Sequence, residues 1–143
     1  MFIGEYNHTI DAKGRLIVPA KYREELGESF YVMKGLDGCL FAYDREAFLD
    51  LKEKMMTLPL SNKESRYLTR AFLGSAQESE FDKQGRILIA APLREHAGLE
   101  KDVVLLGVGN RIEIWSKDRY ENSEDNMDVD DIMAKLEEHG FSL

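Results

Sequence analysis

The chain of 143 residues contains a single cysteine, and this scarcity argues against two classes of protein. Cys39 has no partner for a disulfide within the chain, and three scattered histidines give no metal-ligand spacing around it. A disulfide-stapled secreted domain and a zinc module are therefore both disfavoured. We expect Cys39 to be a small buried hydrophobic residue, and we predict neither a metal nor a cofactor.

Long apolar runs are also missing. None approaches the roughly 20 residues of a membrane helix, and the first residues, 1–5, lack the basic region and apolar stretch of a secretory signal. We therefore expect a cytoplasmic protein. The sequence also lacks a nucleophile elbow, a phosphate-binding glycine loop and a Cys and His arrangement, so we predict that it is not an enzyme.

Negative charge is in excess, with a formal net charge of −8, which by itself disfavours binding to phosphates. The excess is concentrated in residues 120–143, which carry eight carboxylates against one lysine. The rest of the chain is nearly neutral, and its basic residues fall into groups that are compatible with phosphate-binding patches. A solvated surface of mixed charge explains the same composition.

The dominant feature that is present is an internal repeat. Residues 11–27 recur without a gap as residues 82–98, which lie 71 positions later. The aliphatic triplets coincide, and the match continues after one inserted residue as far as Phe48 and Tyr120. Two copies of one unit therefore make up most of the chain. The identities in the first segment are Asp11, Gly14, Arg15, Ala20, Arg23, Glu24 and Gly27, which return as Asp82, Gly85, Arg86, Ala91, Arg94, Glu95 and Gly98.

Each unit predicts a mainly β fold with short helices. An extended segment, at 5–10 and 77–81, leads into an Asp-x-x-Gly-Arg turn and then into an apolar triplet typical of a buried strand, at 16–18 and 87–89. In this turn the aspartate can accept hydrogen bonds from backbone amides, and the glycine can take a positive φ. A helical turn, a hairpin and a final helix complete the unit.

The segment between the units predicts packed helices. Residues 61–64 fit a capping box and precede apolar residues at helical spacing. Asp44 and Ser116 are predicted N-caps, and apolar residues in 129–136 indicate a last amphipathic helix. We therefore divide the chain into repeat 1 (5–47), linking helices (48–75), repeat 2 (76–119) and an acidic C-terminal tail with a helix (120–143).

These residues together resemble the MraZ family. The doubled Asp-x-x-x-Arg motif, the opening Met-Phe-Ile-Gly-Glu-Tyr, and Arg-Ala-Phe at 70–72 leading into Gly-Ser-Ala at 74–76 are similar to MraZ proteins, two-repeat relatives of the AbrB and SpoVT swapped-hairpin regulators. The resemblance extends to about Tyr120. Two of the positions that differ between the copies bear on the turn and the helix: Ala90 stands where the first copy has Pro19, with Pro92 two positions later, and Gln84 stands where it has Lys13.

The resemblance implies both a fold and a function. The fold would be tandem AbrB-like modules of the double-psi or swapped-hairpin β-barrel type, assembled into a ring of several chains. The function would be that of a nucleoid-associated, sequence-specific DNA-binding transcription regulator. It would repress the division and cell-wall operon that contains its own gene by binding short direct repeats in promoter DNA.

Within the repeat, Arg15 and Arg86 are predicted to read DNA bases. A two-stranded ribbon fits the major groove, where arginine binds guanine O6 and N7 in a bidentate manner. Lys13 and Lys83 are predicted to hold phosphates. The alternative is that each arginine pairs with the aspartate of its own turn and only fixes that turn. The predicted turn-shaping residues are Asp11, Gly14, Asp82 and Gly85.

The repeats also predict how the units associate. A small unit with exposed strand edges should pair with a second unit, which the sister repeat can provide, and the whole chain should form a homo-oligomer. Arg23 and Arg94 are expected to be helix-surface ion-pair partners. Two rivals to DNA binding stay open: an antitoxin-like or scaffold module whose acidic tail binds a basic protein, and, much less favoured, a small hydrolase using Asp11 or Asp82.

Overall fold

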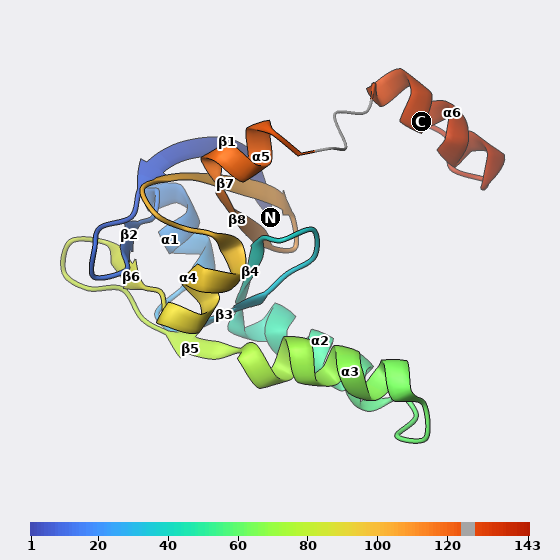
Figure 1. Cartoon of the computed structure of the whole chain (residues 1–143), viewed down its shortest axis with the longest axis horizontal. Helices are drawn as coiled ribbons and strands as arrows, with labels where there is room; N and C mark the ends of the chain where they lie inside the picture. The colour runs from blue at the N-terminus through green and yellow to red at the C-terminus, as the bar shows by residue number, and fades with distance from the viewer. Residues whose placement is uncertain (124–127) are drawn as a thin grey trace.

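In the computed structural model, which describes residues 1–123 and 128–143, both repeats contribute strands to the same sheet (Figure 1). Residues 124–127, part of the predicted acidic tail, lie outside the described residues. The mixed β and α fold class is confirmed. The strands are β1 (Phe2–Thr9), β2 (Arg15–Ile17), β3 (Phe30–Lys34), β4 (Leu40–Asp44), β5 (Gln77–Ser79), β6 (Arg86–Leu88), β7 (Asp102–Gly109) and β8 (Ile112–Ser116).

Six of these strands form one antiparallel sheet in the order β1-β7-β8-β4-β3-β5. The other two, β2 and β6, pair with each other. Exchanging each strand of the first repeat for its equivalent in the second gives the same order read from the opposite edge, so the chain has the topology of a two-fold dimer. The expectation that one repeat pairs with its sister is therefore met, because β1–β7, β4–β8, β3–β5 and β2–β6 all join different repeats.

The large sheet is open within the described ranges, with β1 and β5 at its edges. It is linked to the β2–β6 pair by an isolated bridge between Ile10 and Leu16. The swapped pairing expected from the resemblance is thus realised inside one chain, although hydrogen bonding does not close the sheet into a barrel.

Short helices follow the strands of each unit, and α1, α2, α3 and α4 pack against the sheets. The N-caps of α2 and α5 are those predicted: Asp44 accepts a hydrogen bond from the amide of Ala47, and Ser116 from that of Arg119. The capping-box prediction was wrong by one residue, because Asn62 caps α3 in place of Ser61. No helix in the described part of the chain is long and apolar enough to cross a membrane. The helices are α1 (Ala20–Leu26), α2 (Arg45–Met56), α3 (Lys63–Phe72), the 3-10 helix η1 (Leu73–Ser75), α4 (Ala91–Ala97), α5 (Lys117–Glu121) and the predicted final helix α6 (Val129–Glu138).

Two apolar clusters hold the sheets and helices together. One joins the inner faces of β2 and β6 to α1, α4 and the large sheet, and the other lies under α2 and α3. Cys39 belongs to the second cluster and is buried as predicted, and this burial raises the pKa of its thiol to about 12.

The aliphatic triplets, which the sequence predicts to be buried strands, are buried on one face only. Leu16 and Val18 are buried, but Ile17 is 42% exposed, and its counterpart Leu88 is 58% exposed. Successive side chains of a strand point to opposite faces, and only one face of the β2–β6 pair rests on the core. The other face of this pair is therefore open to solvent.

We expect Gly107→Ala to lower the free energy of unfolding by about 1–3 kcal/mol, since overpacking costs that much. A methyl group at Gly107 would collide with the backbone nitrogen of Ile3 and lie 2.5 Å from the carbonyl carbon of Phe2, which would push β1 away from β7. Urea denaturation measures the change. Gly74→Ala is the control, because a methyl group there meets nothing within 4 Å. Equal stability of the two variants would contradict this account of the β1–β7 contact.

Candidate nucleic-acid interface

The pairing of β2 with β6 brings the two Asp-x-x-Gly-Arg turns to the same end of the molecule (Figure 1). The register places Arg15 opposite Leu88 and Ile17 opposite Arg86. The central pair of the register, Leu16 and Ile87, is buried, so the strand alternation puts the other four side chains on the outer face. We call this pair of strands with its two turns the ribbon. The structure thus brings both predicted arginines to one exposed surface.

In the first turn, the carboxylate of Asp11 organises the backbone. Its Oδ1 accepts hydrogen bonds from the amides of Lys13 at 3.0 Å and Arg15 at 2.9 Å. Its Oδ2 accepts one from Nε of Arg15 at 2.6 Å. The turn closes with the amide of Gly14 donating to the Asp11 carbonyl, and Gly14 has a φ of +87°, which an L side chain rarely adopts.

The second turn repeats this arrangement bond for bond. Asp82 accepts from the amides of Gln84 and Arg86, each at 2.9 Å, and from Nε of Arg86 at 2.8 Å. Gly85 donates to the Asp82 carbonyl and has a φ of +77°. The predicted turn-shaping residues therefore occupy equivalent positions in both repeats.

Each arginine is held by one edge only. The Nε groups of Arg15 and Arg86 bind the aspartates, as the turn-fixing alternative requires. Within the described ranges, however, their terminal Nη1 and Nη2 groups donate to no protein atom. These groups form a planar fork of the kind that binds two acceptors side by side. Fixing the turn and contacting a ligand are therefore compatible roles for the same side chain.

Charge on the ribbon comes from the lysines more than from the arginines. The backbone amide of Arg15, and then its guanidinium, hold the pKa of Asp11 below its ordinary range, and Arg86 does the same for the pKa of Asp82. Both pairs are thus nearly neutral at pH 7. Lys13 and Lys83 lie exposed in the turns, and neither forms an ion pair within the part of the chain that the structure describes.

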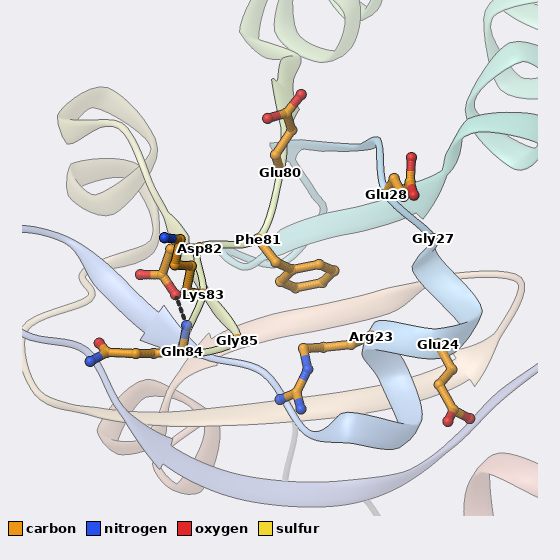
Figure 2. A pocket seen from close by; sticks show the side chains of 10 residues that line it. All are labelled: Arg23, Glu24, Gly27, Glu28, Glu80, Phe81, Asp82, Lys83, Gln84 and Gly85. Atoms are coloured by element: carbon orange, nitrogen blue, oxygen red, sulfur yellow. Dashed lines mark hydrogen bonds between the residues drawn. The ribbon is translucent and has the colours of Figure 1, made fainter.

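Sequence reasoning misplaced two more residues beside the turns. Arg23 and Arg94 form no ion pair among the described residues; instead, the guanidinium of each lies against the turn glycine of the other repeat. Their recurrence at one position of the repeat was the signal that could have found them. A shallow groove of about 730 Å³ runs beside Arg23 and the second turn (Figure 2). Its carboxylates outnumber its two basic groups, which disfavours an anionic ligand there.

We expect Asp11→Asn to destabilise the protein at neutral pH but not in acid. A folded-state pKa below its unfolded value means that the carboxylate adds stability above the unfolded pKa, and that this stability is lost as the pH falls through the folded pKa. The difference in unfolding free energy between wild type and variant, measured by urea denaturation from pH 7 downwards, should shrink below the ordinary aspartate range. A difference that is independent of pH would show that the charge of Asp11 is not what holds the turn.

Comparison of the sequence with known proteins identifies its family. A family model described as "MraZ protein, putative antitoxin-like" matches residues 1–71 and again 72–139, so both repeats are matched. A relative from Thermoanaerobacter sp. (strain X514) is 58% identical over 129 residues, which is 90% of each chain. One from Lachnoclostridium phytofermentans is 57% identical over 144 residues and 100% of each chain.

A third relative, from Alkaliphilus oremlandii, is 53% identical over 143 residues, which cover 99% of this chain and 100% of its own. All three carry the name "Transcriptional regulator MraZ". Because the family model covers almost the whole sequence in two repeats, and the relatives align over nearly their full lengths, the chain belongs to the MraZ family.

Proposed function

We propose that this chain is a transcription regulator that binds double-stranded DNA sequence-specifically through the ribbon. The naming of its relatives supports the regulatory role. The observation that carries the DNA contact is the paired presentation of Arg15 and Arg86, each held at Nε with its terminal fork free of protein acceptors in the described ranges. A two-stranded ribbon is narrow enough for the major groove, whose guanine edges offer the two acceptors that such a fork binds.

The proposed roles divide between specificity and affinity. Arg15 and Arg86 read bases, while Lys13 and Lys83 neutralise phosphates and add affinity that depends on salt. Asp11 and the equivalent Asp82 hold the arginines in place before DNA arrives, so that less side-chain freedom is lost on binding. In this scheme the chain carries out no catalysis, and it acts in the cytoplasm at the nucleoid.

We expect Arg15→Ala and Arg86→Ala each to weaken binding to DNA from upstream of the protein's own gene by about 1–3 kcal/mol, because each loses a bidentate base contact. Fluorescence titration against this DNA and a shuffled duplex measures the loss at two salt concentrations. Arg45→Ala is the matched control, since it removes the same charge from α2, outside the ribbon. Lys13→Ala should weaken both duplexes equally and reduce the salt slope by about one.

Light scattering must accompany the titration, because a change of assembly would alter affinity indirectly. If Arg15→Ala keeps its mass and still binds like wild type, the arginine only fixes its turn. The antitoxin-like interaction module would then become the better proposal. One observation favours that rival in advance: α6 carries exposed apolar side chains, including Val129 and Leu136, beside a strongly acidic set.

We also propose that the protein works as a homo-oligomer, a ring of several chains, on tandem repeats in the promoter that it represses. Supporting features are the open edges β1 and β5 and the exposed apolar residues along the α2–α3 hairpin, which include Met56, Leu60 and Tyr67. Surfaces of this kind favour association between copies. An assembly that displays several ribbons would contact several repeats at once.

Duplexes with one, two and three copies of the repeat test this assembly. We expect the apparent affinity to rise steeply with copy number, since linked sites raise apparent affinity by about 10²–10⁴. Spacing the same copies far apart is the control, because it keeps the base contacts and removes the linkage. A single repeat bound as tightly as three would rule out multivalent binding.

A further inference from the structure

Two arginines outside the proposed base contacts connect the repeats at the turns. A methyl group at Gly85 would lie 2.6 Å from Nη1 of Arg23, and one at Gly14 would lie 2.9 Å from Nε of Arg94. Both turn glycines are buried although their turns lie at the surface. Each guanidinium therefore covers the glycine of the opposite repeat, and the contact needs a residue without a side chain.

Arg23 also holds the backbone that receives the second turn. Its Nη1 donates to the carbonyl of Val18 at 2.6 Å, and the amide of Val18 donates in turn to the carbonyl of Gly85 at 3.2 Å. Figure 2 shows its side chain leaving α1 toward the segment that contains Gly85. The helix of the first repeat is thus connected to the turn of the second through the backbone of one residue, Val18, whose carbonyl binds Arg23 and whose amide binds Gly85.

The reciprocal contact of Arg94 is similar but not identical. The amide of Ile89 donates to the carbonyl of Gly14 at 2.8 Å, as Val18 does to Gly85. Arg94 Nε is buried without a hydrogen-bond partner in the described part of the chain. Arg94 therefore lies against the turn of the first repeat without the backbone hydrogen bond that Arg23 makes in the equivalent place.

We propose that Arg23 and Arg94 are positioning residues for DNA recognition and that they act crosswise. Arg23 on the first repeat fixes the turn that carries Arg86, and Arg94 on the second repeat fixes the turn that carries Arg15. This inference rests on the proposed function, and it adds that each base-reading arginine depends on the opposite repeat. A flat guanidinium against a glycine peptide restricts the turn more than a lysine ammonium does, because the guanidinium is planar and rigid.

The surroundings of Arg23 argue against a direct phosphate contact. The groove beside it has only one other basic side chain, Lys83, and its carboxylates would repel a phosphate. Arg23 is also partly buried, with one terminal nitrogen already bonded to Val18. The carboxylate-bearing residues lining the groove are Glu24, Glu28, Glu80 and Asp82.

A double-mutant cycle on DNA affinity tests the crosswise coupling. We expect Arg23→Ala to weaken specific binding about tenfold, within the range for residues coupled in one network. Combined with Arg86→Ala it should add little further loss, whereas combined with Arg15→Ala the two losses should multiply. Arg94→Ala should show the opposite pattern. In each of the four double variants, the dependence of affinity on salt should equal that of the Arg15→Ala or Arg86→Ala single variant.

Amide hydrogen exchange tests the same coupling without DNA. The amides of Gly14 and Gly85 each donate to the aspartate carbonyl of their own turn at 3.0 Å, so both should be protected. In Arg23→Ala, exchange should accelerate at Gly85 and stay unchanged at Gly14. Hydrogen exchange tests the crosswise contact separately from the proposed DNA-binding function. If the wild-type protein does not prefer the specific duplex, the proposed function is wrong. The exchange pattern still shows whether Arg23 fixes the turn of the opposite repeat.

Arg23→Lys provides a second variant that keeps the charge and the aliphatic stem. We expect Arg23→Lys to accelerate amide exchange at Gly85 but not at Gly14. Its loss of affinity should likewise be non-additive with that of Arg86→Ala. This variant keeps the test decisive if Arg23→Ala does not fold. Equal acceleration at both glycines, or losses that multiply with Arg15→Ala and Arg86→Ala alike, would overturn the proposal. A salt slope reduced by about one would overturn it too, because Arg23 would then be a phosphate contact.

Discussion

The antiparallel pairing of β2 with β6 is the contact on which the rest of the interface depends. Each strand has only three residues, too few to be stable alone, and each belongs to a different repeat. Their pairing is extended by Val18 and Ile89, whose amides reach the turn glycine of the opposite repeat. Because the partner strand is in the same chain, this pairing does not depend on protein concentration, unlike that of two separate chains.

The turns order the arginine side chains and still leave some of their hydrogen-bond donors free for a ligand. A free arginine has a large conformational entropy, and a fully bonded one has nothing left to offer a ligand. By using only Nε, the aspartate orients the guanidinium and leaves its other edge open. The same bond nearly cancels the charge of the pair, so general attraction to polyanions falls to Lys13 and Lys83. Orientation and net charge are thereby assigned to different side chains.

Much of the fold was predictable because the turns and helix caps depend on residues that are close together in the sequence, and because the repeat is visible in the sequence itself. The turns followed from Asp and Gly at fixed spacing, and the N-caps from Asp44 and Ser116. Ile17 and Leu88 were misjudged because a triplet of aliphatic residues does not reveal which face of a strand is covered. Arg23 and Arg94 were misjudged because their contacts, with Gly85 and Gly14, join residues far apart in sequence. Only the register between repeats shows them.

Because the two repeats are joined in one chain, the two ends of the ribbon can differ. A dimer of identical chains must carry every substitution twice, and its two-fold axis makes it suited to inverted DNA repeats. Here the halves are free to diverge, and they have. Lys13 of the first turn is replaced by Gln84 in the second, and among the described residues Arg23 donates to a backbone carbonyl while its equivalent Arg94 does not. The ribbon therefore has a distinguishable head and tail. Under the proposed function, a ribbon with such polarity would match DNA sites that all point the same way along the duplex.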